Sequence, residues 1–196
     1  AHKIVVVYNA IDERFWVTPA DADVARVRER YQLDHRFVLY VGNIKPHKNL
    51  VRLMEAFDEW RRGAVDEDLK LLIIGDEISK LPALRRAVHR YKLHKHVRFL
   101  GYMPDDTLAV LYRLAAVFVF LSLYEGFGLP SLEAMASGTP VVTSNVSGLP
   151  EVTGDAAVLV DPYDVEAIAD GLRRVLTNPQ LAAEMRRKGL ERAREF

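Results

Sequence analysis

Short apolar runs rich in Val, Ile and Phe alternate along this chain with longer segments that have helical spacing. Several of these runs are continuously apolar, which is typical of parallel strands buried on both faces. The alternation predicts an α/β fold, a Rossmann-like, doubly wound parallel sheet with helices on both faces. Strands are expected at residues 3–8, 36–42, 69–75, 96–101, 116–122, 139–144 and 156–162.

Helix boundaries are marked by residues that favour them. Asn49 is the predicted N-cap of one helix, and Pro104, followed by two aspartates, suits the start of another. Gly138 is the predicted C-terminal cap of a third. Helices are expected at residues 21–31, 49–60, 81–91, 105–115, 130–138 and 165–176.

Length and charge limit the class of protein. The chain has 196 residues, of which 49% are hydrophobic, which is enough for one sizeable core. Its 27 basic and 27 acidic residues cancel, so no overall charge favours nucleic acid. There is no cysteine for a disulfide or thiolate metal site, and no apolar run long enough to span a membrane. A cytoplasmic protein is expected.

The domain organisation is predicted as one domain with two flanking pieces. Residues 21–177 form the domain, residues 1–20 hold the first strand and an interdomain linker, and residues 178–196 form a truncated final helix that trails from it. Both ends look cut, which indicates a piece of a larger protein.

Ligands of open α/β sheets bind beyond the carboxyl ends of the strands, and three loops there carry candidate residues. In the first, "VGNIKPHKNL", Gly42 permits an unusual turn and Lys48 stands at a helix start, where it could contact a phosphate. A solvated loop lysine fits this loop equally well. Lys45 and His47 are weaker candidates for the same role.

The second loop lies in "YEGFGLPSLEAMASGTPVV". Its residues 126–129 fall near a helix N-terminus, where glycines and free amides favour an anion such as a diphosphate. Glu133 lies one turn into that helix and could accept hydrogen bonds from two ribose hydroxyls. Glu125 could hydrogen-bond a sugar or a ribose. Taken singly, the two glutamates are better explained as a loop acid and a surface helix acid.

The third loop contains Tyr102 and Met103, which could face a nucleobase, although packing explains Tyr102 too. No G-x-G-x-x-G follows the first strand and no P-loop is present, which disfavours a dinucleotide dehydrogenase. No metal site is expected. The acidic run at 66–68 is interpreted as a solvated turn, and the histidines of the basic stretch 85–98 fit no common zinc spacing.

Read in order, these loops resemble a known family. "GNIKPHKNL", "IIGD", "FLGYMPDDTLAVLY", "YEGFGLPSLEAMASGTPVVTSNVSGLPEV" and "AAVLVDPYDVEAIADGL" look like the C-terminal, donor-binding half of a GT-B glycosyltransferase of the retaining family GT4. The resemblance covers nearly the whole chain. The most specific part is the glutamate pair that brackets "GFGLP".

The resemblance implies a role for each candidate residue. Lys48 and the amides of Gly126, Phe127, Gly128 and Leu129 contact the diphosphate or sugar, and the base sits near Tyr102 and Met103. Glu133 binds the ribose. Glu125 approaches the sugar, as neither nucleophile nor general base, and with Lys48 is a candidate catalytic residue. Gly42 and Asn43 complete the donor site; where this chain has Asn43 the family commonly has an arginine, and Lys45 could supply the missing charge.

The same resemblance implies a retaining, metal-independent hexosyltransferase that needs no cofactor. GDP-mannose is the favoured donor, with UDP- and ADP-linked sugars as alternatives, and the acceptor is unknown. Its partner is an N-terminal acceptor-binding domain that this chain does not include, so the isolated domain is expected to be inactive. Contact with the cytoplasmic face of a membrane stays open. Two other interpretations are a non-catalytic nucleotide-sugar-binding module and a nucleotide-sugar epimerase of the same fold.

Overall fold

The computed structural model describes residues 3, 7–63, 66, 68–75 and 81–196. Within these residues six parallel strands form one sheet in the order β3-β2-β1-β4-β5-β6, which confirms the predicted Rossmann-like class. The central strands are buried almost completely on both faces, as their continuous apolar sequence predicts. The strands are β1 Phe37–Val41, β2 Lys70–Ile74, β3 Val97–Gly101, β4 Val117–Phe120, β5 Val141–Ser144 and β6 Ala157–Val160.

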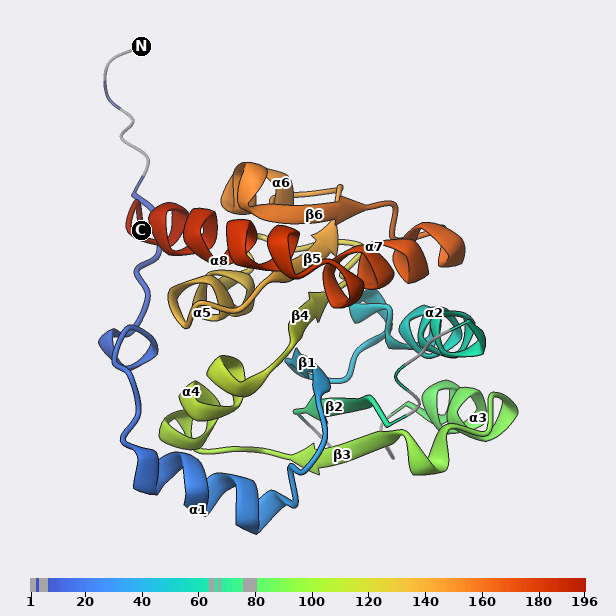
Figure 1. Cartoon of the computed structure of the whole chain (residues 1–196). Coiled ribbons are helices and arrows are strands. Elements are labelled where there is room, and N and C mark those ends of the chain that lie inside the picture. The colour runs from blue at the N-terminus through green and yellow to red at the C-terminus, as the bar shows by residue number, and fades with distance from the viewer. Residues whose placement is uncertain (1–2, 4–6, 64–65, 67, 76–80) are drawn as a thin grey trace.

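Helices cover both faces of the sheet (Figure 1). On one face α2 contacts both α3 and α7, α1, α4 and α5 form the layer on the other, and α8 contacts both α5 and α7. The α-helices are α1 Asp21–Tyr31, α2 Leu50–Arg62, α3 Pro82–Arg90, α4 Asp105–Leu114, α5 Leu129–Ala136, α6 Leu149–Thr153, α7 Val165–Thr177 and α8 Pro179–Ala193, with 3-10 turns at Glu13–Phe15, Pro46–Lys48, Leu93–Lys95 and Gly154–Ala156.

All three predicted helix boundaries are confirmed in position. Helix α4 begins directly after Pro104. Gly138 follows α5 with φ of 71°, and its amide and that of Thr139 donate to the last carbonyls of the helix. The predicted cap at Asn49 is wrong in its chemistry. Asn49 precedes α2, but its buried side-chain amide donates to the Pro162 carbonyl at 2.7 Å instead of capping the helix.

The flanking segments pack onto the domain. Half of the expected strand at 3–8, residues 4–6, lies outside the described residues, and Lys3, Val7 and Tyr8 belong to no strand. Asp76 of the "IIGD" motif and Glu67 of the acidic run also lie outside them. In the predicted linker the ring of Phe15 is buried 5.6 Å from that of Tyr112. The final helix does not trail from the domain, because Met185, Gly189 and Ala193 of α8 are buried.

The order of the strands creates a topological switch point between β1 and β4. β1 lies between β2 and β4. After β1 the chain forms β2 and β3 on one side of it, and then crosses back to form β4, β5 and β6 on the other side. The helices that follow β1 and β4, α2 and α5, consequently lie on opposite faces (Figure 1). The loops after two neighbouring strands therefore diverge, and such a switch point is where open α/β sheets bind ligands.

Candidate functional site

Lys48 and Glu125 meet at this switch point. Lys48 ends the turn after β1, Glu125 follows β4, and the ammonium donates a hydrogen bond to the carboxylate although 77 positions separate them. Their side chains are only 12% and 15% exposed. The Lys48 ammonium also lies 4.9 Å from the centre of the Phe120 ring. The structure thus brings the two candidate catalytic residues together as a largely buried ion pair.

Backbone bonds join the loops around this pair. The Leu123 amide donates to the His47 carbonyl at 2.8 Å, which ties the loop after β4 to the loop after β1. The Ser147 hydroxyl accepts from the Glu125 amide at 3.1 Å and donates to the Glu125 carbonyl at 2.8 Å. The loop after β5 therefore supports Glu125 from the other side. Sequence reasoning gave Ser147 no role.

The glycine-rich loop 126–129 presents free amides. Gly128 has φ of 98° and precedes α5, and a Cβ atom there would lie 2.5 Å from the Leu149 side chain. Only glycine suits this position. Among the described residues, no partner accepts a hydrogen bond from the amides of residues 126–129. Unpaired amides at the N-terminus of a helix favour an anion.

Glu133 is held by Tyr112. It lies one turn into α5, and its carboxylate accepts a hydrogen bond of 2.9 Å from the hydroxyl of Tyr112, whose side chain is fully buried in α4. Burial raises the pKa of Glu133. The hydrogen bond from Tyr112 lowers this pKa, and the negative charges of Asp105 and Asp12 raise it further. Burial, with Glu133 beside it, also raises the pKa of Tyr112. Sequence reasoning missed Tyr112 because its spacing marks it only as a buried helix residue.

The remaining predicted residues differ in what they can offer. Tyr102 is 83% exposed after β3, whereas the Met103 side chain is 5% exposed and belongs to the core. Because Met103 as a whole is buried, it offers a ligand almost no surface. Gly42 and the neighbouring Gly75 come so close that a Cβ on Gly75 would lie 1.9 Å from the Gly42 carbonyl oxygen. Asn43 is exposed, and its carbonyl accepts from the Tyr40 hydroxyl at 3.1 Å.

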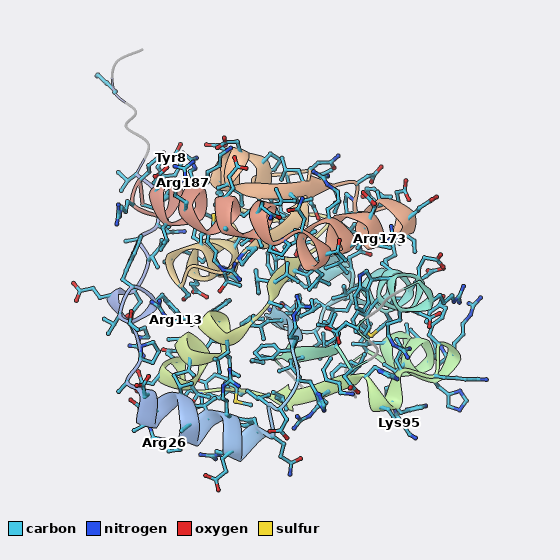
Figure 2. All side chains as sticks on the ribbon, in the orientation of Figure 1. Tyr8, Arg26, Lys95, Arg113, Arg173 and Arg187 are labelled. Carbon is cyan, nitrogen blue, oxygen red and sulfur yellow. The ribbon has the colours of Figure 1, made fainter. Side chains whose placement is uncertain are left out.

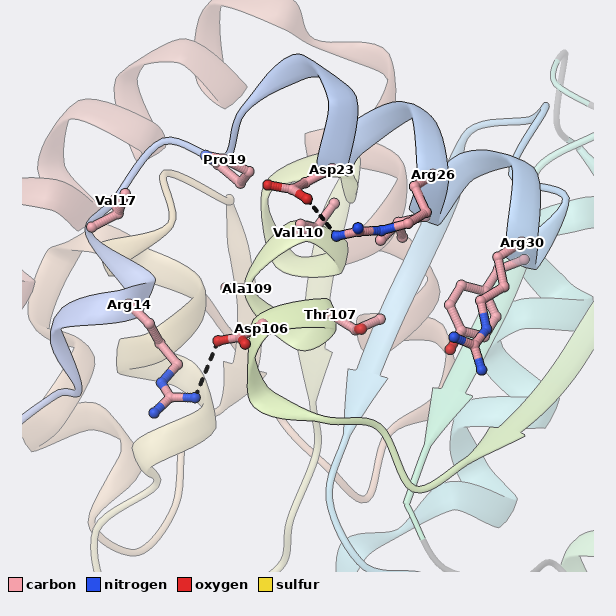
Figure 3. Close-up of a pocket in the computed structure, with 12 residues that line it drawn as sticks. Arg14, Val17, Pro19, Asp23, Arg26, Arg30, Asp106, Thr107, Ala109 and Val110 are labelled. Atoms are coloured by element: carbon pink, nitrogen blue, oxygen red, sulfur yellow. Dashed lines mark hydrogen bonds and ion pairs between the residues drawn. The ribbon is translucent and has the colours of Figure 1, made fainter.

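A separate cavity of about 380 Å³ lies between α1 and α4 (Figure 3). Arg14, Arg26 and Arg30 line it together with Asp23 and Asp106, and it shares no residue with the loops around Lys48 and Glu125. Among the described residues, no three His, Cys, Asp or Glu side chains are grouped so that they could hold a metal ion. None of the described helices is both long and apolar enough to cross a membrane.

Comparison with known proteins gives the family. Residues 21–192 match the family described as "Glycosyl transferases group 1". The chain belongs to this glycosyltransferase family. The O-antigen chain mannosyltransferase B of Escherichia coli is 37% identical over 186 residues, which are 92% of this chain and 48% of that protein. The serotype-specific mannosyltransferase WbdA of Escherichia coli is 31% identical over 196 residues, 99% of this chain and 24% of that protein.

A solved structure agrees. The sucrose-phosphate synthase from Thermosynechococcus elongatus is 31% identical and superposes with a TM-score of 0.80, over 95% of this chain and 47% of that one. This glycosyltransferase chain thus spans about half the length, or less, of the relatives that it matches. The predicted family is confirmed, and the roles of the individual site residues stay predictions.

Proposed function

We propose that this chain is the donor-binding half of a retaining glycosyltransferase that uses GDP-mannose. The observation that carries the proposal is the placement of the Lys48–Glu125 pair beside the free amides of residues 126–129, with Glu133 one turn further along α5. One cation, a set of amide donors and a held carboxylate are the groups that a diphosphate and a ribose require.

The charges that develop during glycosyl transfer determine the roles proposed for Lys48 and the amides of residues 126–129. Glycosyl transfer leaves positive charge on the sugar ring and negative charge on the departing diphosphate. Lys48 and the loop amides are donors fixed in position before the reaction, and such donors stabilise a leaving group without a metal ion. Because Lys48 is already largely buried, its charge acts on the diphosphate with little screening by water.

Glu125 and Glu133 bind hydroxyl groups. Glu133 would accept from the ribose hydroxyls with the carboxylate oxygen that Tyr112 leaves free, and Glu125 would approach the transferred sugar once the diphosphate shares Lys48. The base would lie near the loop of Tyr102 and Met103 after β3, where Tyr102 is exposed.

The choice of mannose rests on the relatives. Two proteins that match nearly the whole chain are named mannosyltransferases. Since the chain spans about half of the first of them, we propose that an acceptor-binding domain elsewhere in the whole protein completes the cleft. The isolated chain would then bind nucleotide and transfer no sugar.

Sugar transfer by the whole protein tests the proposal. Incubation with radiolabelled GDP-mannose and an extract of the producing cells should give a labelled product, UDP- and ADP-linked hexoses should give far less, and a Lys48→Ala variant should give none. Binding of GDP without transfer to any component of the extract would favour a non-catalytic module. Change of the donor sugar's configuration without transfer would indicate an epimerase. Turnover by the isolated 196-residue chain would refute its proposed inactivity.

A further inference from the structure

Three aromatic rings from distant parts of the chain meet at the glycine-rich loop. The ring centres of Tyr8 and Phe127 are 5.8 Å apart, those of Tyr8 and Phe196 5.2 Å, and those of Phe127 and Phe196 5.5 Å. Figures 1 and 2 show the segment through Tyr8 running past the C-terminal end of α8. We refer to these three side chains as the aromatic triad.

The two outer rings of the triad are fixed independently of the loop. The Tyr8 hydroxyl donates to the Glu151 carboxylate at 3.0 Å, and the Arg192 guanidinium lies 5.0 Å from the centre of the Phe196 ring. Arg192 in turn donates to the Val152 carbonyl at 3.0 Å. Helices α6 and α8 thus hold the surface against which Phe127 packs.

The loop is held at its two ends, by the bonds between Ser147 and Glu125 and by the Ser131 amide, which donates to the Gly128 carbonyl at 2.9 Å. Phe127 stands between Gly126 and Gly128, which contribute no side chain, and glycine has the greatest backbone freedom of any residue. The amides of residues 126–129 have no described partner that would fix them. Between these two ends, the ring of Phe127, half-buried against the core, is the side-chain contact through which the surroundings act on these amides.

We propose that Tyr8 and Phe196 are positioning residues that hold Phe127, and through it the amides of residues 126–129, in the orientation that receives the donor diphosphate. This inference rests on the proposed function. A loop that is already ordered loses little conformational freedom when the ligand binds, and a loosened loop loses more, which lowers affinity. Neither outer ring touches the substrate.

Removal of one outer ring tests the triad in the chain as it stands. Phe196→Ala should weaken the tightest-binding of GDP, UDP and ADP about three- to tenfold in calorimetry, the range expected for one aromatic contact. In the absence of nucleotide, the NMR order parameters of the 126–128 amides should fall from about 0.85 to below about 0.6. Phe196→Tyr keeps the ring, so its nucleotide affinity and its loop order parameters should match those of the wild type.

Tyr91→Ala is the matched control. Tyr91 also follows a helix and has an arginine side chain over its ring, Arg90 at 5.5 Å, but it lies after α3 and away from the loop. Tyr91→Ala should leave the nucleotide affinity and the order parameters of the 126–128 amides unchanged. Tyr8→Phe, which keeps the ring and loses the bond to Glu151, should change the affinity less than about twofold.

The outcomes separate the triad from the proposed function. If the wild-type chain and the whole protein bind none of the three nucleotides, the proposed function is wrong, and the order parameters still show whether the triad holds the loop. Unchanged order parameters in Phe196→Ala would overturn the triad. The triad would also be overturned if the loop became mobile in Phe196→Ala while this variant bound nucleotide as tightly as the wild type. If Phe196→Ala does not fold, Phe196→Leu gives the same readings with the apolar volume largely kept.

Discussion

The switch-point edge of the sheet and the cavity between α1 and α4 both gather charged side chains, but in different ways. In the cavity Arg26 pairs with Asp23 one helical turn away, and their side chains are 74% and 45% exposed. At the edge Lys48 and Glu125, from opposite sides of the switch point, are 12% and 15% exposed. Exposed pairs contribute little, whereas poorly solvated charges interact strongly with a ligand.

The comparison teaches that hollowness and chemistry need not coincide. The cavity of Figure 3 is a hollow, yet its charges are solvated, and Arg14 and Arg26 are paired with near neighbours. The edge has a largely buried ion pair, free amides and a carboxylate whose pKa burial raises. Poorly solvated charges and hydrogen-bond donors without a partner indicate a binding site better than cavity volume does.

The largest expected effect is that of Lys48→Ala. Loss of the ammonium should weaken binding of GDP and of inorganic pyrophosphate by about ten- to a hundredfold, because a hydrogen bond to a charged group is lost from a poorly solvated site. Calorimetry measures both. The matched change in the cavity, Arg26→Ala, should alter neither affinity. Equal losses in the two variants would remove the distinction between the regions.

Glu133→Ala should have a smaller and more selective effect. If Glu133 binds ribose, the variant loses about tenfold in affinity for GDP and keeps its affinity for pyrophosphate, which has no ribose. Calorimetric titration of the same protein with both ligands gives the ratio directly. A similar loss for both ligands would place Glu133 at the diphosphate instead.

The pH dependence of stability follows from the raised pKa of Glu133. Burial, the main cause of the shift, makes the folded state hold the proton more tightly than the unfolded state, whose carboxyl titrates near about 4.3. This contribution to the free energy of unfolding is fully present below the unfolded value and is lost as the pH rises through the folded value. Denaturant titrations of wild type and Glu133→Gln across this window should show a decline only in the wild type.

Nucleotide binding should respond in the opposite sense. Ribose recognition needs the ionised carboxylate, so the affinity for GDP should fall as the pH is lowered through the raised folded-state pKa of Glu133. Tyr112→Phe removes the hydrogen bond that opposes this rise, and should move the fall to higher pH. A fall at the same pH in both proteins would mean that another group controls binding.

The smallest effect is expected for Glu125→Gln. The carboxylate competes with an incoming anion for Lys48, so its neutralisation should raise the affinity for pyrophosphate about a few-fold. The corresponding change in the cavity, Asp23→Asn, frees a solvated arginine and should not create measurable pyrophosphate binding there. Weaker binding by Glu125→Gln would show that the acid holds Lys48 in place.

Most of the fold could be predicted because its signals are local. Continuous apolar runs gave the strands, and Pro104 and Gly138 marked helix ends through their own backbone preferences. Asn49 failed as a cap because its side chain bonds to Pro162, 113 positions away. Nothing near Asn49 in the sequence encodes that partner.

The candidate site divides in the same way. Motif spacing placed Lys48, Glu125 and Glu133, and it could not show that the first two pair or that Tyr112 holds the third. The packing of Phe196 on Phe127 depends on α8 lying across α5, a tertiary arrangement that the amphipathic pattern of α8 leaves undetermined.

Amide shift mapping by NMR tests the central claim most directly. Titration of the isotope-labelled chain with GDP, UDP and ADP should shift the amides of residues 126–129 and those around Lys48 and Glu133, and leave the α1 and α4 residues that line the cavity unmoved. Shifts confined to that cavity, or none at millimolar nucleotide, would contradict a donor site at the edge where β1 and β4 end.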